Sequence, residues 1–196
     1  MKAMIKDGRV HGLPAMQHFD SPFCNERPKG CELPSLLVVH NISLPRAAFA
    51  TPYVHDLFMG MLDTQVHPSF ISLKGLEVSS HFVIYRTGVI HQYVATTQRA
   101  WHAGLSAFRG RQGCNDFSIG IELEGCDELP FTWRQYARLA TLTTVLMAHY
   151  PITMDSIVGH SDIAPGRKTD PGPCFDWPRY FRCIRQRTLS ECSGSD

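Results

Sequence analysis

Residues 35–43, SLLVVHNIS, decide the fold class of this chain. The apolar run LLVV is followed at once by His40, and the stretch lies between Pro34 and Pro45. A short, continuous apolar run bounded by turn-forming residues is typical of a strand buried inside a sheet. The pattern therefore predicts a central strand over residues 36–41, around which the other elements are arranged.

The next segments predict a helix and a hairpin. Residues 51–62, TPYVHDLFMGML, place apolar side chains at three- and four-residue spacing after a Thr-Pro start, which predicts a helix. Residues 81–86 and 89–94 alternate in polarity on either side of Thr87-Gly88. Two alternating segments joined by such a turn predict a β-hairpin.

Two longer segments follow the hairpin. Residues 117–125, FSIGIELEG, alternate apolar residues with polar ones that include Glu122 and Glu124, which predicts a strand with both carboxylates on one face. Residues 132–150, TWRQYARLATLTTVLMAHY, carry apolar residues near a 3.6-residue period. Thr132 is suited to cap the amino terminus of this second predicted helix.

The last predicted element is a short strand over residues 156–160, SIVGH. The order β-α-β-β-β-α-β predicts an α/β fold of the α+β type, in which helices flank a mixed central sheet. The chain, residues 1–196, is expected to form a single domain. Residues 1–32 are expected to form a loop-rich leader that wraps over it, and residues 183–196 a flexible tail.

Composition and charge limit the classes of function. Of 196 residues, 43% are hydrophobic and 19% are charged, as is typical of a compact globular domain. The 19 Lys and Arg residues and 18 Asp and Glu residues give a formal net charge of +1. We therefore expect no nucleic-acid partner and no attraction to a membrane surface. The apolar runs are too short or too polar to span a bilayer.

The amino terminus and the cysteines indicate the cellular compartment. Asp7, Arg9 and His11 interrupt the region where a secretory signal needs an unbroken apolar run. The seven cysteines cannot all pair and include no CxxC motif, so we expect mostly free thiols in a reducing compartment. These features predict a cytoplasmic protein, while the oligomeric state is not predicted.

Two histidines stand at the carboxyl ends of predicted strands, His40 and His160. This rim of a sheet is where α/β proteins place their sites. Asp162, Asp170 and Asp176 are candidate oxygen ligands, and two imidazoles with one carboxylate form a catalytic zinc set with an open position. Spacing favours Asp170, which a Pro- and Gly-rich loop returns towards His160. The alternative is that the histidines are unrelated core residues.

Glu122 and Lys168 are the other candidates for catalysis. A carboxylate in an apolar strand is costly to bury unless it is paired or used, and a general base beside a metal would be such a use. The alternative is that Glu122 and Glu124 lie on a solvated strand face. Lys168, two positions before Asp170, would stabilise a developing oxyanion. The alternative is an ordinary solvated lysine.

Two residues are candidates for substrate binding. Asn41 follows His40 directly and is expected to form a hydrogen bond with the substrate. Trp101, in the block RAWHAG, offers an aromatic platform for a sugar or a peptide. The alternative for Trp101 is a half-buried surface residue. No glycine-rich loop that binds phosphate is present.

Five blocks together carry a resemblance to a known family. In chain order they are LLVVHNIS, SSHFVI, RAWHAG, NDFSIGIELEG and GHSDIAPGRKTDPGPCFDW. They resemble the zinc-dependent N-acetylmuramoyl-L-alanine amidases of the type-2 family, which also includes the peptidoglycan-recognition proteins. The likeness covers roughly residues 33–180 and is greatest to the cytoplasmic anhydro-muropeptide amidases of cell-wall recycling.

The resemblance implies a metal centre and a reaction. It implies that His40, His160 and Asp170 bind Zn²⁺, in preference to Asp162 and Asp176. The implied reaction is hydrolysis of the amide between the lactyl group of (anhydro-)N-acetylmuramic acid and L-alanine of the stem peptide. The implied substrate is a small muropeptide.

The resemblance also implies roles for the remaining candidates. Glu122 is implied to activate the attacking water, and Lys168 to stabilise the tetrahedral intermediate. Asn41 and Trp101 match positions that line the muropeptide groove.

Two positions depart from the family pattern. Glu77 and Gly113 align with positions where related enzymes often carry arginines that hold the carboxylates of the stem peptide, and Arg109 or Arg111 are nearby candidates for this role. A competing function is a peptidoglycan-recognition module that binds muropeptide without cleaving it. Another is an amidase that acts on the intact wall outside the cytoplasm. The complete ligand set favours the enzyme, and the amino terminus favours the cytoplasm.

Overall fold

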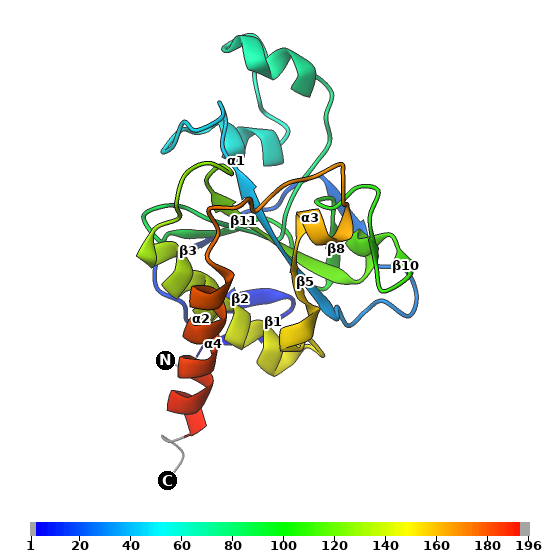
Figure 1. Cartoon of the computed structure of the whole chain (residues 1–196). Coiled ribbons are helices and arrows are strands. Elements are labelled where there is room, and N and C mark those ends of the chain that lie inside the picture. Colours follow the sequence, from blue (N-terminus) through cyan, green and yellow to red (C-terminus); the bar gives the residue numbers. More distant parts are fainter. Residues whose placement is uncertain (1–2, 193–196) are drawn as a thin grey trace.

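The computed structural model describes residues 3–192, with side chains to Leu189, and is organised around one mixed sheet (Figure 1). Six strands lie in the order β12-β5-β11-β6-β7-β3. Their bounds are Met16–His18 (β3), Leu36–Ile42 (β5), Phe82–Ile84 (β6), Ile90–Gln92 (β7), Ser118–Glu124 (β11) and Ile157–Gly159 (β12). Neighbouring strands are parallel except for β6 and β7. The predicted fold class is confirmed.

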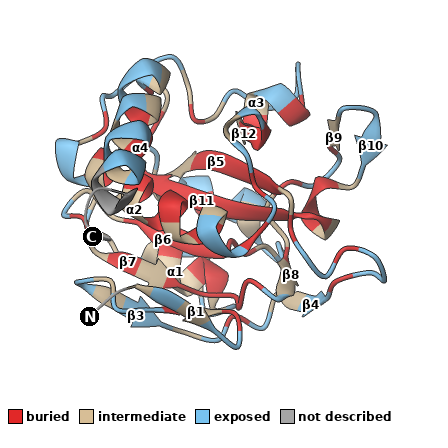
Figure 2. Ribbon diagram, turned by 90° about the horizontal axis from the view of Figure 1, so that it is seen from below, coloured by how far each residue is buried: buried red, intermediate tan, exposed pale blue. Residues whose placement is uncertain are grey.

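Strand β5 lies near the centre of the sheet, between β11 and β12. Its first four residues are apolar and fully buried, so the predicted strand is confirmed, and it extends to Ile42. Every residue of β5 pairs in parallel register with β11, from Leu36 opposite Ser118 to Ile42 opposite Glu124. Figure 2 shows these strands buried beneath helices whose outer faces are exposed.

Two long helices, α2 (Trp133–His149) and α4 (Trp177–Cys192), cover one face of the sheet and lie side by side (Figure 1). The hydroxyl groups of Thr143 on α2 and Tyr180 on α4 form a hydrogen bond of 2.6 Å. Inward-facing residues of the strands and helices form one apolar cluster, which includes Leu37, Val39, Ile119, Ile121, Leu139 and Ile184. Burial of each such side chain stabilises the fold by about 1.5–3 kcal/mol.

The opposite face of the sheet is covered by shorter elements, among them α1 (Tyr53–Phe58), α3 (His160–Ile163) and the segment between β8 (Gln98–Ala100) and β11. The alternate residues of β5, Leu36 and Val38, pack here against Ala103 and Ile163. Since side chains alternate along a strand, this face also carries His40 and Glu122 at the carboxyl ends of β5 and β11.

The predicted hairpin is confirmed, and the first predicted helix is shorter than expected. Strands β6 and β7 are antiparallel, and their turn is closed by a hydrogen bond of 2.9 Å from Tyr85 N–H to the Val89 carbonyl. Helix α1 ends at Phe58 because Gly60 adopts a left-handed φ of 71°. The following segment, with the 3₁₀ helix η1 (Pro68–Leu73), projects from the body of the molecule at the top of Figure 1.

Both terminal regions contain regular structure. The leader includes the short strands β1 (Met4–Lys6), β2 (Arg9–His11) and β4 (Cys24–Glu26), and its strand β3 joins the edge of the main sheet. The prediction of a flexible tail is wrong for residues 183–192, which form the end of α4. That helix is held because Tyr180 and Ile184 are buried against α2. Residues 193–196 lie outside the described part of the chain.

The expectations about the cysteines and about membrane-spanning segments can be compared with the structure. Each cysteine whose side chain is described is a free thiol, as predicted, and Cys192 falls outside that set. Among residues 3–192, no helix combines the length and the apolar character needed to cross a membrane.

The amino terminus of α2 is fixed by a capping box. The Thr132 hydroxyl accepts a hydrogen bond of 3.2 Å from Gln135 N–H, and the Gln135 side chain accepts one of 2.9 Å from Thr132 N–H. The predicted N-cap is therefore confirmed, and two amide groups that a helix leaves unpaired are satisfied.

Replacement of Thr132 by alanine should lower the free energy of unfolding by about 1 kcal/mol, because one of these amides loses its acceptor. Urea denaturation measures the change. The exposed Thr87→Ala is the control and should stay within about 0.5 kcal/mol of wild type. Equal stability of both variants would show that the cap does not stabilise α2.

Candidate metal centre

Three predicted ligand residues meet at one edge of the sheet. His40 lies near the end of β5, His160 follows β12 as the first residue of α3, and Asp170 lies on the loop after α3. Because β5 and β12 are parallel neighbours, their carboxyl ends bring the two histidines together. In sequence, His40 is separated by 120 positions from His160 and by 130 from Asp170, and the order of the strands in the sheet brings all three together.

The ligand atoms of this group face one another. His40 Nδ1 lies 3.0 Å from His160 Nδ1, and the two nitrogens lie 2.9 and 3.1 Å from Asp170 Oδ2. A tetrahedral zinc with bonds of about 2.0–2.1 Å separates its ligands by about 3.3–3.4 Å. The observed spacing therefore fits a small metal ion after a slight widening.

The pKa values of His40 and Asp170 are shifted in the directions that metal binding requires. His40 is 1% exposed, and burial lowers its pKa to about 4, so its imidazole is neutral at pH 7. Burial alone would raise the pKa of Asp170, but hydrogen bonds from His160 and His40 outweigh it and lower that pKa below its usual range. A neutral imidazole at His40 beside an ionised carboxylate at Asp170 suits zinc, which binds deprotonated ligands.

Glu122 lies beside this group because of the strand register. It is the direct partner of His40 across the β5–β11 pair, and its Oε1 lies 4.0 Å from His40 Nδ1. The side chain is buried, and Oε2 has no hydrogen-bond partner among the described residues. Burial, together with the nearby charge of Asp170, raises the pKa of Glu122 well above its usual value, while Lys168 opposes the shift.

Glu124 occupies the same face of β11 but has a different role. Its Oε1 accepts a hydrogen bond of 2.6 Å from Ala50 N–H, and its Oε2 accepts one of 3.0 Å from Arg86 N–H. Both carboxylate oxygens of Glu124 are therefore paired, and their hydrogen bonds link β11 to two loops. Both glutamates are buried, so the alternative of a solvated strand face does not describe this structure.

The other aspartates lie outside the ligand group. Asp162 Oδ2 accepts a hydrogen bond of 2.7 Å from Gly159 N–H, and Asp176 Oδ1 accepts one of 2.8 Å from Arg179 N–H at the start of α4. Lys168 is exposed on the loop between α3 and Asp170, and it borders the same cavity as Asp170.

The candidate centre opens into a cavity of about 240 Å³. Its polar lining residues are His40, Asn41, His102, Glu122, His160, Lys168 and Asp170. Its apolar lining residues include Leu57 and Phe58 of α1, Leu73 of η1, and Leu76 and Val78 of the segment that follows. A cavity lined by both kinds of side chain suits a substrate that has polar and apolar parts.

The two predicted substrate-binding residues line this cavity, and both also hold the fold. Asn41 Nδ2 donates hydrogen bonds of 2.7 Å to Asp127 Oδ1 and 3.1 Å to the Pro171 carbonyl. Trp101 Nε1 donates one of 2.7 Å to Asn25 Oδ1. The donor groups of both side chains are thus occupied within the protein, and their contact with substrate stays a prediction.

The arginines expected near the peptide end of the substrate lie elsewhere. Arg109 pairs with Asp155 at 2.6 Å, and Arg111 stacks 4.0 Å over the ring of Phe117. Neither arginine borders the cavity at the metal centre. Their positions therefore do not support the expectation that Arg109 or Arg111 holds the carboxylates of the stem peptide.

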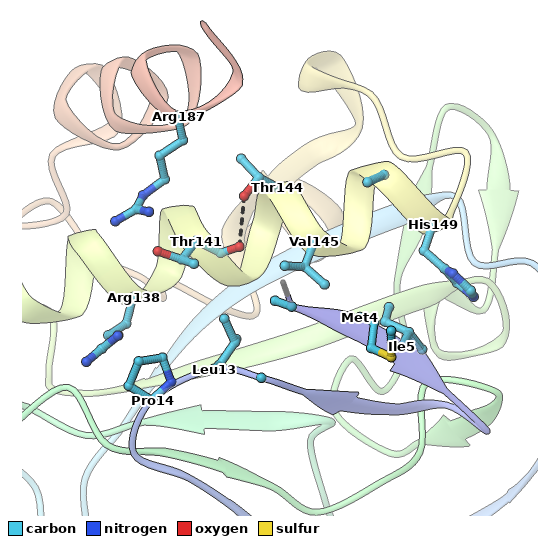
Figure 3. Close-up of a pocket in the computed structure, with 13 residues that line it drawn as sticks. Met4, Ile5, Leu13, Pro14, Arg138, Thr141, Thr144, Val145, His149 and Arg187 are labelled. Carbon is cyan, nitrogen blue, oxygen red and sulfur yellow. Dashed lines mark hydrogen bonds between the residues drawn. The ribbon is translucent and has the colours of Figure 1, made fainter. Parts of the chain in front are cut away.

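A larger cavity, of about 630 Å³, lies between the β1–β2 hairpin, α2 and α4 (Figure 3). Its walls carry Leu13, Pro14, Val145 and two arginines, Arg138 and Arg187, and include none of the predicted site residues. It has no carboxylate and no pair of histidines, so the larger volume does not mark the candidate reaction site.

Sequence reasoning missed the residues that lie behind the candidate ligand histidines. His102 Nδ1 lies 2.9 Å from His40 Nε2, and the Ala103 carbonyl lies 3.1 Å from His160 Nε2. Both belong to the block RAWHAG, in which only Trp101 was predicted to have a role. The one signal in the sequence was that His102 directly follows Trp101, which was already a candidate site residue.

Comparison with known proteins agrees with this geometry. Residues 31–173 match the N-acetylmuramoyl-L-alanine amidase family. The 1,6-anhydro-N-acetylmuramyl-L-alanine amidase AmpD of Escherichia coli (strain K12) is 52% identical over 176 residues, which cover 90% of this chain and 96% of the relative. AmpD of Haemophilus influenzae is 50% identical over 182 residues, or 92% and 98% of the two chains.

Two solved structures share the fold. A crystal structure of an AmpD derivative has a TM-score of 0.87 and 48% identity, and the match covers 92% of this chain and 99% of that chain. A complex of the Escherichia coli amidase AmiD with anhydro-N-acetylmuramic acid-L-Ala-D-gamma-Glu-L-Lys has a TM-score of 0.57 and 29% identity, covering 92% and 65%. The expected resemblance is confirmed: this chain belongs to the N-acetylmuramoyl-L-alanine amidase family and is an amidase.

Proposed function

We propose that this chain uses a bound Zn²⁺ to hydrolyse the amide between anhydro-N-acetylmuramic acid and L-alanine of cell-wall stem peptides, in cytoplasmic peptidoglycan recycling. The observation that carries the proposal is the convergence of His40, His160 and Asp170 beside the buried Glu122. The names of the AmpD relatives and the substrate in the AmiD complex support the anhydro sugar.

The metal would be held by His40 Nδ1, His160 Nδ1 and Asp170 Oδ2, which leaves one side of the group open to the cavity. Zinc in such a position supplies Lewis acidity towards carbonyl oxygens and water. The unpaired Oε2 of Glu122 supports this assignment, because a buried carboxylate oxygen without a partner is costly unless a ligand completes its surroundings.

Glu122 is proposed as the general base. Its carboxylate accepts a proton from the attacking water and later delivers it to the nitrogen of the leaving L-alanine. The charge of Lys168 favours the ionised form of Glu122 that this step requires. Lys168 also borders the cavity, where its ammonium group stabilises the oxyanion that develops on the scissile carbonyl.

The competing function is a recognition module that binds muropeptide without cleaving it. Retention of the three ligand residues together with Glu122 supports hydrolysis instead, because binding alone needs no buried base. Asn41 and Trp101 are proposed to line the path of the muropeptide, since both border the cavity at the metal position.

The purified protein should contain about one zinc per chain, and His160→Ala should lose both the metal and the activity, since two remaining ligands hold zinc poorly. Metal content by atomic emission and release of stem peptide from anhydro-muropeptide are the two measurements. His149→Ala, at an exposed histidine on α2, should match wild type. Full zinc content in His160→Ala would remove His160 from the ligand set.

Glu122→Gln should keep its zinc but lower kcat by about 10²–10⁴-fold, because the amide has the shape of the carboxylate and cannot accept the proton. Steady-state kinetics on anhydro-muropeptide, with metal analysis of the same sample, test this. The exposed Glu32→Gln serves as the matched control. If Glu122→Gln lost its metal instead, Glu122 would be a ligand and not the base.

Anhydro-muropeptide should be cleaved with a kcat/KM at least about tenfold higher than the corresponding muropeptide with ordinary muramic acid, and intact sacculi should be cleaved more slowly still. The small volume of the cavity, about 240 Å³, favours a soluble fragment over a polymer. Peptide release from each substrate is followed by liquid chromatography. Equal rates on sacculi would contradict the proposed recycling role while leaving the amidase activity intact.

A further inference from the structure

A histidine outside the ligand group lies directly behind His40. His102 Nδ1 is 2.9 Å from His40 Nε2, and His102 Nε2 is 3.1 Å from the hydroxyl of Ser118. The rings of His40 and His102 meet edge to face, with centroids 5.0 Å apart and an interplanar angle of 84°. Ser118 is fully buried on β11. These contacts form a continuous row from a ligand histidine to the central sheet.

A metal bound at His40 Nδ1 would leave this row one consistent direction of donation. With a metal bound at Nδ1, the proton of His40 would lie on Nε2 and be donated to His102 Nδ1, 2.9 Å away. His102 then carries its own proton on Nε2 and donates it to Ser118 Oγ. If Nδ1 of His102 were protonated instead, two N–H groups would face each other at 2.9 Å.

The backbone of the same segment supports the second ligand histidine. The Ala103 carbonyl accepts a hydrogen bond from His160 Nε2 at 3.1 Å. Asn115 Oδ1 in turn accepts hydrogen bonds from the N–H groups of His102, at 3.1 Å, and Ala103, at 2.7 Å. One dipeptide, fixed by a single asparagine, therefore lies behind both imidazoles.

Strand β11 provides the space that His102 occupies. A Cβ atom at Gly120 would lie 2.5 Å from His102 Cγ and 2.6 Å from His102 Nδ1, closer than atoms can approach. Gly120 does not have a left-handed φ, so space and not backbone conformation explains the glycine. On this face of β11, Ser118 accepts from His102, Gly120 makes room for its ring, and Glu122 points to the metal position.

We infer that His102 is a positioning residue, which fixes the tautomer and orientation of His40 through the row His40–His102–Ser118 and thereby raises the affinity for zinc. The inference rests on the proposed function, since the orientation of His40 matters to zinc affinity only if His40 is a ligand. Loss of the partner that orients a ligand histidine lowers metal affinity or activity about 10–100-fold.

The test uses zinc affinity, measured on the full chain by competition with a chromogenic chelator. His102→Leu removes the acceptor and should raise the zinc Kd about 10–100-fold. His102→Asn retains an oxygen near the position of Nδ1 and should stay within about threefold of wild type. The visible spectrum of the Co²⁺-loaded protein should change in His102→Leu and be preserved in His102→Asn. His149→Leu is the control at an exposed histidine.

Ser118→Ala provides a second variant that leaves His102 in place and frees its proton to move to Nδ1. It should raise the zinc Kd by a smaller factor, about 3–10-fold. Thermal unfolding of the metal-free proteins separates these effects from loss of folding. If His102→Leu does not fold, Ser118→Ala and His102→Asn decide the question.

Three outcomes are distinguishable. Wild-type affinity and an unchanged Co²⁺ spectrum in His102→Leu, or wild-type affinity in Ser118→Ala where His102→Leu cannot be purified, would overturn the inference. The same holds if His102→Asn were as impaired as His102→Leu. Absence of zinc binding by the wild-type protein would overturn the proposed metal centre, and this result is obtained before any variant is compared.

Discussion

Parallel pairing of β5 with its two neighbours is the constraint on which the site depends. The register sets Glu122 opposite His40 on one side, and Gly159, the residue before His160, opposite Val39 on the other. Because the strands run in the same direction, their carboxyl ends place one carboxylate and two imidazoles at one edge. A slip of one residue would turn Glu122 towards α2 and α4 and bring an apolar neighbour to the candidate metal position. Packing of the apolar face of the sheet fixes the strand register, and the register in turn fixes the positions of His40, Glu122 and His160 at the edge.

The loop after α3 has to return Asp170 to the edge it has just left. Ser161 N–H donates a hydrogen bond of 3.0 Å to the Asp170 carbonyl, which closes the loop at its base. A Cβ at Gly159 would lie 2.8 Å from Pro171 Cδ, so the glycine permits the close packing of that proline against β12. Asn41 holds the Pro171 carbonyl from β5 at 3.1 Å. The dense Pro and Gly content of this loop thus serves to fix one carboxylate, and Asn41 is part of that fixation.

The parts of the site that follow from strand ends could be predicted, whereas those that depend on tertiary neighbours could not. His40 and His160 end apolar runs, and this local pattern identifies them without knowledge of the fold. His102 lies 62 residues from His40, and no period or spacing in the sequence links the two. Helix α4 was not predicted from the sequence for a related reason. Its sequence is rich in arginine, and only a narrow apolar stripe that includes Tyr180 and Ile184 packs against α2. Hydrophobic periodicity identifies helices with a wide apolar face more readily than helices with a narrow one.

Glu122 and Glu124 show why residue type alone does not distinguish structure from chemistry. Both are buried on the same face of β11, two positions apart. Glu124 uses both oxygens to bind backbone N–H groups, so its burial is compensated by hydrogen bonds. Glu122 has a buried oxygen without a partner, which costs about 1–3 kcal/mol in a folded protein. The fold tolerates this cost at the cavity, beside the three candidate ligand atoms of His40, His160 and Asp170. A buried carboxylate with an unpaired oxygen, as in Glu122, therefore indicates the candidate reactive position better than residue type does. The hydrogen bonds of Glu124 already account for its burial.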